Sequence, residues 1–187
     1  MKQYRIVLAE DHIMIRSAIR HLIHEMSDVS VIGEADNGRH LLQIIDRETP
    51  DMAIVDISMP KLNGFQAAYE IAARYPSTAV MILTMHKRVD FLKEAFAAGV
   101  RGYLLKEDSD QELIAAIDTI RTGGTYITQK LSGPVMRDGS GTCAFENPTS
   151  LDFLSSRERQ IFHFIIEGKK NREIADALYI SVRTVDN

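Results

Sequence analysis

Short hydrophobic runs alternate with amphipathic segments along the first two thirds of the chain. Five runs, rich in Val, Ile and Leu, are each followed by a segment in which hydrophobic residues recur at helical spacing. The runs span residues 4–9, 29–35, 52–56, 79–84 and 102–106. Strands that alternate with helices form parallel sheets with helices on both faces. The pattern therefore predicts an α/β domain over residues 1–125 with a doubly wound, five-stranded parallel sheet.

The third run contains no polar residue until it ends at Asp56. Pro50 and Pro60 bound it, and such a short, continuous hydrophobic run is typical of a strand that is buried on both faces. In open α/β sheets, ligands bind just beyond the carboxyl ends of the strands. Asp56 is therefore a candidate nucleophile or metal ligand. The alternative is that its side chain only caps a turn or the next helix.

Further polar residues follow other predicted strands and are expected at the same edge of the sheet. Glu10 and Asp11 follow the first strand, Thr84 ends the fourth, and Lys106 ends the fifth. Three carboxylates at one edge repel one another unless a cation neutralises them, and oxygen ligands suit Mg²⁺. The sequence therefore predicts a site in which Mg²⁺ and Lys106 offset phosphate charge, a carboxylate attacks phosphorus and Thr84 donates a hydrogen bond. Taken singly, each residue has a simpler explanation, such as a helix dipole for the acid pair or solvent exposure for Lys106.

Residues 126–150 are predicted to form a linker. One short helix, interrupted by Gly133-Pro134, is expected over residues 126–136. Residues 137–150 are rich in Gly, Ser, Thr, Asn and Asp and contain few hydrophobic residues. The only cysteine, Cys143, falls in this segment, which excludes an internal disulfide and a thiolate metal cluster.

Residues 151–187 have helical spacing throughout. Ser155 and Glu158 have the spacing of a capping box at the start of a first helix. Asn171 opens a second helix, and Ser181 is placed to cap a third. The pattern predicts a small all-α domain.

Where three such helices form a helix-turn-helix, the third is the helix that reads DNA. In a helix-turn-helix its N-terminal residues meet base edges in the major groove, while nearby cations reach phosphates. The candidate DNA contacts are Lys169, Lys170, Arg172, Arg183, Thr184, Asp186 and Asn187. The alternative is a solvated surface, because residues 151–187 hold six Lys and Arg against six Asp and Glu.

Composition and charge indicate a globular protein without bulk attraction to nucleic acid or membranes. Of the 187 residues, 45% are hydrophobic and 26% are charged, and the net charge is -4. No hydrophobic run approaches the ~20 residues that cross a bilayer, and the first residues do not resemble a signal peptide. We expect a cytoplasmic protein that does not bind membranes. His21 and His24 share a predicted helix face, but they have no third ligand nearby in the sequence and are expected to be solvated.

The polar residues at the strand ends resemble those of the receiver domain of two-component response regulators. The resemblance covers residues 1–125 and rests on Glu10-Asp11, Asp56, Met59-Pro60, Gly64, Thr84 and Lys106. It implies a flavodoxin-like receiver fold in which Asp56 is the phosphoacceptor. The implied Mg²⁺ ligands are Glu10, Asp11, Asp56 and the backbone carbonyl of Ser58.

Two further positions carry implications of the same resemblance. Thr84 and Tyr103, which lies three residues before Lys106, match the positions of the conformational switch of receivers. Glu107 stands where many receivers have a proline. The resemblance therefore does not predict the conformation of the peptide bond after Lys106.

Residues 151–187 resemble the opening of a LuxR-type helix-turn-helix. The similarity rests on residues 154–159, 167–175 and 180–185. A receiver joined to such a domain resembles the NarL/FixJ class of response regulators. This class implies transcriptional control by phosphorylation, a cognate sensor histidine kinase, double-stranded promoter DNA and a homodimer on activation, and it implies a regulator, not an enzyme. Since its third helix is longer and a fourth follows, the chain is expected to be C-terminally truncated.

Two other functions use the same residues. A receiver can act as a phosphorylation-dependent protein-interaction switch without DNA binding, with the C-terminal helices docking a protein. A steep salt dependence of binding to duplex DNA distinguishes the two functions. A phosphohydrolase with an aspartate nucleophile normally needs a general acid beside that nucleophile, and Asp56-Ile57-Ser58 lacks the second acid.

Overall fold

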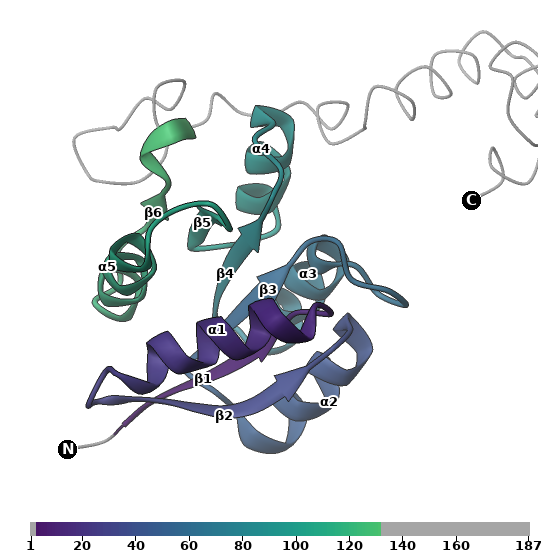
Figure 1. Cartoon of the computed structure of the whole chain (residues 1–187). Helices are drawn as coiled ribbons and strands as arrows, with labels where there is room; N and C mark the ends of the chain where they lie inside the picture. The colour runs from purple at the N-terminus through teal and green to yellow at the C-terminus, as the bar shows by residue number, and fades with distance from the viewer. Residues whose placement is uncertain (1–2, 132–187) are drawn as a thin grey trace, which may run out of the picture. The chain divides into compact units, whose positions relative to one another are not determined.

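The computed structural model describes residues 3–131, which form a parallel sheet flanked by helices (Figure 1). The strands are β1 (Tyr4–Ala9), β2 (Val29–Ala35), β3 (Met52–Asp56), β4 (Ala79–Thr84), β5 (Gly102–Leu105) and β6 (Tyr126–Ile127). The helices are α1 (Ile13–His24), α2 (Gly38–Glu48), α3 (Gly64–Arg74), α4 (Val89–Ala97), α5 (Asp110–Arg121) and the short 3-10 helix η1 (Gln129–Leu131). The predicted doubly wound α/β fold is confirmed.

The strand order β2-β1-β3-β4-β5-β6 places the first strand, β1, second from one edge of the sheet. The chain first adds β2 on one side of β1 and then adds all later strands on the other side. The order therefore reverses between β1 and β3, and ligands of open α/β sheets bind at such a reversal. Register pairing of Ala9 with Val55 brings the residues that follow, Glu10 and Asp56, to the same place.

The prediction of five strands is corrected by a short sixth strand. Tyr126–Ile127 was expected to begin a helix, but it pairs in parallel with Gly102 and Tyr103. The pairing uses backbone hydrogen bonds from Tyr126 N to Arg101 O at 3.0 Å and from Thr128 N to Tyr103 O at 2.9 Å. A strand of two residues is too short to show a hydrophobic period, so its partner decides its conformation. The rest of the predicted helix, residues 132–136, lies outside the described residues.

Two hydrophobic cores form on opposite faces of the sheet. One core contains buried residues of α2, α3 and α4, and the other contains buried residues of α1 and α5. Along β3 the side chains alternate between them, with Ala53 and Val55 in the first core and Met52 and Ile54 in the second. All five residues of β3 are buried, which confirms the strand predicted to be covered on both faces. The last of them, Asp56, is therefore held at the end of a rigid element.

The turn after β3 depends on Gly64. A Cβ atom at this position would lie 2.3 Å from the Asp56 carbonyl oxygen and 2.8 Å from Ile57 Cα, so only glycine allows α3 to begin this close to β3. Asn63 caps the helix by accepting a hydrogen bond from Gln66 N, and the Gln66 side chain accepts one from Asn63 N in return. The turn and cap together fix the backbone that follows Asp56.

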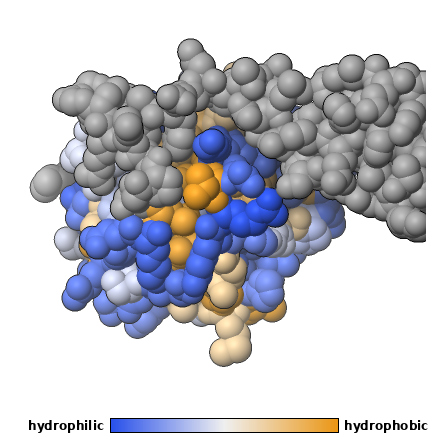
Figure 2. Space-filling view, turned by 90° about the horizontal axis from the view of Figure 1, so that it is seen from above, coloured by the Kyte–Doolittle hydropathy of each residue, from blue (hydrophilic) through white to orange (hydrophobic). Residues whose placement is uncertain are grey.

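Among the described residues that are visible from above, hydrophilic ones predominate, with a hydrophobic area among them (Figure 2). The large hydrophobic side chains that are exposed in the described part of the chain are Ile13, Met14, Tyr69 and Met85. None of the helices within residues 3–131 has the length and hydrophobicity needed to span a bilayer.

Candidate functional site

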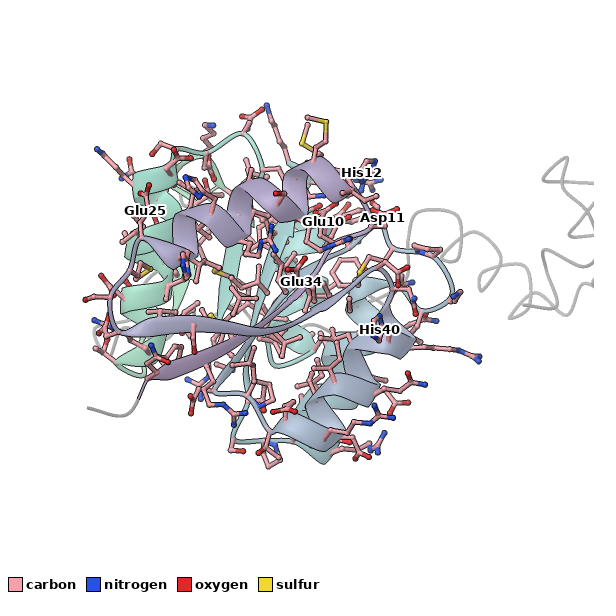
Figure 3. The ribbon with its side chains drawn as sticks, turned by 60° about the horizontal axis from the view of Figure 1, so that its bottom comes forward. Glu10, Asp11, His12, Glu25, Glu34 and His40 are labelled. Atoms are coloured by element: carbon pink, nitrogen blue, oxygen red, sulfur yellow. The ribbon has the colours of Figure 1, made fainter. Side chains whose placement is uncertain are left out.

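The three predicted acids meet at the carboxyl ends of β1 and β3. Glu10 and Asp56 are almost completely buried, with 1% and 2% exposure, while Asp11 is partly exposed. One ligand atom from each of Glu10, Asp11, His12 and Asp56 lies within 4.8 Å of the other three. Figure 3 shows Glu10, Asp11 and His12 together at the end where α1 begins. The structure thus assembles the carboxylates that the sequence analysis expected at this edge.

Lys106 lies inside the same cluster. Its Nζ is 2.6 Å from Glu10 Oε2 and 3.1 Å from Asp56 Oδ2, and only 6% of its side chain is exposed. Its position follows from the strand ladder, because Lys106 N donates a hydrogen bond to Thr84 O at 2.9 Å. The alternative of a solvated lysine is excluded by this burial.

The charges of the cluster do not balance among the residues that the structure describes. Three carboxylates face one ammonium group, which leaves two negative charges. Glu10 Oε2, Asp11 Oδ1 and Asp56 Oδ2 are buried without a hydrogen bond of good geometry, although ion-pair contacts reach each of them. Buried carboxylate oxygens need such partners or a metal ion. The donor set therefore fits a divalent cation with oxygen ligands, such as Mg²⁺.

Thr84 ends β4, the strand next to β3, and is fully buried. Its Oγ1 accepts a hydrogen bond from His86 N at 3.2 Å. Ser58 lies two residues after Asp56 at an exposed turn, and its Oγ is 3.1 Å from His86 Nε2. The role predicted for the Ser58 backbone carbonyl stays a prediction.

Tyr103 on β5 is completely buried, and its hydroxyl donates a hydrogen bond to His86 O at 2.9 Å. Burial raises the pKa of this hydroxyl well above its ordinary value, and the negative charge of Glu94 adds to the effect. The sequence analysis placed Tyr103 at a switch position. In the structure the ring already fills the space beside the loop that follows Thr84.

His86 is a residue that the sequence analysis missed. It connects Ser58, Thr84 and Tyr103 through the three hydrogen bonds above, and its ring meets Phe91 of α4 at a centroid distance of 4.7 Å. Hydrophobic periodicity carries no signal for such a residue, because its contacts come from the loop after β3 and from β4, β5 and α4. The position two residues after a predicted site threonine was the only available hint.

Glu107 replaces the proline of many receivers and follows a trans peptide bond, since the described residues contain no cis peptide. Its carboxylate joins two distant segments: Oε2 lies 2.7 Å from Lys87 Nζ, and Oε1 lies 2.9 Å from Lys130 Nζ. Hydrogen bonds from Lys87 and Lys130 lower the pKa of the Glu107 carboxyl group. The departure from the family pattern thus connects the loop after β4 to η1.

His12 is the second residue that the sequence analysis missed. Its Nδ1 lies 2.8 Å from Asp11 Oδ1 and 3.1 Å from Glu10 Oε1, and its backbone N donates to the same Glu10 oxygen at 3.1 Å. The sequence signal for His12 was its position directly after Glu10 and Asp11. His21 and His24 on α1 were expected to be solvated. They are exposed, and His21 Nε2 lies 3.8 Å from Glu25 Oε1.

The candidate DNA contacts all lie outside the described residues. They are Lys169, Lys170, Arg172, Arg183, Thr184, Asp186 and Asn187. The capping box at Ser155 and Glu158 and the linker residues beyond Leu131 lie there as well. These interpretations stay predictions.

Two family models match the chain. The response regulator receiver domain matches residues 6–118, and the bacterial regulatory proteins of the luxR family match residues 152–187. The oxygen regulatory protein NreC of Staphylococcus carnosus is 33% identical over 186 residues, covering 97% of this chain and 86% of that protein. The transcriptional regulatory protein DegU of Brevibacillus brevis is 28% identical over 198 residues, covering 98% of this chain and 83% of that protein.

A solved structure agrees with the described fold. A LuxR-family two-component response regulator from Aurantimonas sp. SI85-9A1 is similar with a TM-score of 0.68 and 29% identity, over 70% of this chain and 94% of that one.

Proposed function

The chain belongs to the two-component response regulators of the NarL/FixJ type, in which a receiver domain precedes a LuxR-type DNA-binding domain, and from this we propose that phosphorylation of Asp56 controls its binding to promoter DNA. We assign the receiver domain to residues 1–125, the linker to 126–150 and the DNA-binding domain to 151–187. The matches to residues 6–118 and 152–187 support this division. The described sheet extends the receiver slightly, to Ile127 of β6.

The observation that carries the proposal is the place of the Asp56 carboxylate. It lies at the end of a fully buried strand with Lys106 Nζ 3.1 Å from Oδ2. A carboxylate oxygen of Asp56 attacks the phosphorus of a phosphohistidine on a sensor histidine kinase. The bond from phosphorus to the histidine nitrogen breaks, and the histidine leaves with its electron pair. The product is an acyl phosphate on Asp56, whose oxygens the Lys106 ammonium group stabilises.

The same cluster is proposed to hold Mg²⁺ through Glu10, Asp11, Asp56 and the backbone carbonyl of Ser58. When bound, the ion offsets the negative charge that the phosphoryl group brings. The buried oxygens without a hydrogen bond and the two uncompensated negative charges support this assignment. Glu10 also keeps Lys106 in place, because Oε2 lies 2.6 Å from Nζ.

We propose that the signal leaves the site through Thr84 and His86. A phosphate on Asp56 adds roughly -1.5 to -2 charge and new acceptor oxygens, so it attracts the Thr84 hydroxyl. The backbone N of His86 now donates to Thr84 Oγ1 at 3.2 Å, and the carbonyl of His86 accepts from Tyr103. A movement of Thr84 is therefore passed to the loop after β4 and to the face formed by α4, β5 and α5. That face is the proposed site of homodimer formation on activation.

The output is proposed to be binding of double-stranded promoter DNA by residues 151–187. The match to the luxR family supports DNA binding over a purely protein-binding role. The proposed contacts are Lys169, Lys170, Arg172, Arg183, Thr184, Asp186 and Asn187. Phosphate contacts of this kind give a binding constant that falls steeply with salt.

Phosphotransfer from a small-molecule phosphoryl donor tests the proposal. The chain is incubated with the donor with and without Mg²⁺, and phosphoprotein is separated on a phosphate-binding gel. The expected result is Mg²⁺-dependent labelling that Asp56→Asn abolishes and that Asp90→Asn, a change at an exposed acid of α4, leaves unchanged. Labelling of Asp56→Asn to the wild-type level overturns the assignment. Binding of labelled and unlabelled protein to duplex DNA across a salt series then tests the output.

A further inference from the structure

His12 lies at the metal site with a nitrogen directed at two of the acids. Its Nδ1 is 2.8 Å from Asp11 Oδ1 and 3.1 Å from Glu10 Oε1, and it belongs to the group of ligand atoms that lie within 4.8 Å of one another. The imidazole is 65% exposed and makes no side-chain cap bond, although His12 is the N-cap residue of α1. The first turn of α1 therefore does not use the ring.

The distances around Nδ1 match those between neighbouring ligands of one ion. Two ligands at about 2.1 Å from an octahedral ion, at right angles to each other, are about 3.0 Å apart. The separations of His12 Nδ1 from the Asp11 and Glu10 oxygens lie on either side of this value. In the metal-free chain these separations are those of hydrogen bonds in which an Nδ1–H donates to the two carboxylates, and a cation that binds here takes the place of that proton.

The carboxylates of the cluster independently indicate a ligand. Glu10 and Asp56 are nine-tenths buried or more, and Glu10 Oε2 and Asp56 Oδ2 lack a hydrogen bond of good geometry while facing the same cluster. Lys106 neutralises only one of the three negative charges. Because one oxygen of each acid and one nitrogen of the imidazole lie within 4.8 Å of one another, an ion held by the acids lies within reach of the ring.

We propose that His12 is a nitrogen ligand of this site and makes it prefer first-row transition ions such as Ni²⁺ or Mn²⁺ over Mg²⁺. Mg²⁺ binds hard oxygen ligands, whereas imidazole suits transition ions, whose affinity for a nitrogen-containing site rises from Mn²⁺ to Ni²⁺. The inference rests on the proposed phosphoryl site, since it uses the same acids. It adds a fourth side-chain ligand and a preference among ions.

Competition between metals tests the role of His12. Binding of Ni²⁺ and Mg²⁺ is measured by isothermal titration calorimetry at one fixed pH for the wild type, His12→Asn and His21→Asn. Asparagine replaces the nitrogen ligand by an amide oxygen and is a favoured N-cap residue, so α1 is kept. His21→Asn is the matched control, because His21 lies exposed on the same helix outside the cluster.

His12→Asn is expected to weaken Ni²⁺ binding about tenfold or more while Mg²⁺ binding changes by less than about threefold. His21→Asn is expected to change neither. Pulsed EPR of the Mn²⁺-loaded wild type is expected to detect a coordinated imidazole nitrogen, and this signal should vanish in His12→Asn. An unchanged ratio of Ni²⁺ to Mg²⁺ affinity in His12→Asn, or a nitrogen signal that survives in it, overturns the inference.

Asp11→Asn separates this inference from the proposed function. If Asp11→Asn weakens the binding of both ions but His12→Asn has no selective effect, the acids hold the metal. In that case only the role proposed for His12 fails. If Asp11→Asn leaves the binding of both ions unchanged, the acids are not the metal ligands. In that case the proposed Mg²⁺ site and the inference fail together.

Discussion

Asp56→Asn is expected to stabilise the metal-free protein even though it removes the proposed phosphoacceptor. The carboxylate of Asp56 is attracted by Lys106 Nζ at 3.1 Å, an interaction of ~5 kcal/mol at an effective dielectric constant of about 20. Glu10 and Asp11 lie no more than 4.8 Å from it in the ligand group, and their repulsion amounts to ~7 kcal/mol or more in the same treatment. The repulsion exceeds the attraction by ~2 kcal/mol, which disfavours the charged form of the Asp56 side chain.

Replacing this carboxylate by an amide keeps its shape and removes its charge. Lys106 retains Glu10 as a partner at 2.6 Å, so no buried ammonium group is left unpaired. A gain of ~2 kcal/mol raises the Tm of a domain of this size by roughly 5–10 °C. Added Mg²⁺ should reverse the order of the two Tm values. An ion at a concentration of 100 times its Kd stabilises the wild type by about 2.7 kcal/mol, and it stabilises the variant by less.

Thermal unfolding followed by far-UV circular dichroism measures this effect, and the absence of tryptophan makes fluorescence a poor probe. The wild type, Asp56→Asn and the exposed control Asp90→Asn are compared in a chelator and in millimolar Mg²⁺. We expect Asp56→Asn to unfold at the highest temperature in the chelator and to lose this advantage in Mg²⁺. A lower Tm of Asp56→Asn in the chelator contradicts the picture of a cluster with excess negative charge.

Three further changes test the turn, the coupling and the loop contacts. Gly64→Ala is expected to destabilise the receiver by about 1–3 kcal/mol in urea unfolding, because the added Cβ meets the Asp56 carbonyl oxygen, and an unchanged midpoint contradicts this. Thr84→Ala should accept phosphate yet fail to shift the oligomeric state in size-exclusion chromatography, and a wild-type shift means that the coupling takes another route. Because the pKa of Glu107 is lowered in the folded state, its ion pairs stabilise the fold fully above the unfolded pKa, and this stabilisation is lost as the pH falls through the folded pKa. The Tm difference between wild type and Glu107→Gln should therefore be smaller at pH 3 than at pH 7. A difference of equal size at both pH values argues against the ion pairs with Lys87 and Lys130.

Much of the fold could be predicted because its main determinants are local. The alternation of hydrophobic runs and amphipathic segments predicts β1 to β5, since parallel strands are buried on both faces and their helices on one. Strand β6 could not be found in this way, because Tyr126–Ile127 is held by its partner strand β5. The predicted helix relied on the local spacing of hydrophobic residues, whereas the pairing with β5 determines the conformation of these two residues.

The candidate site could be predicted where it depends on strand ends. Asp56, Glu10 and Lys106 are brought together by the geometry of any parallel sheet with this strand order. His12 and His86 lie on loops, and their contacts depend on loop paths that have no period in the sequence. The inward position of Tyr103, bonded to His86 O, likewise follows from the loop after β4.

The most direct test of the central claim is to locate the phosphoryl group on the chain. Protein labelled by a small-molecule phosphoryl donor in Mg²⁺ is treated with borohydride, which reduces an acyl phosphate and leaves unmodified carboxylates intact. Digestion and tandem mass spectrometry then identify the reduced residue. The account predicts reduction at Asp56 alone, and none in Asp56→Asn. Reduction at Glu10, Asp11 or another acid, with Asp56 intact, would contradict it.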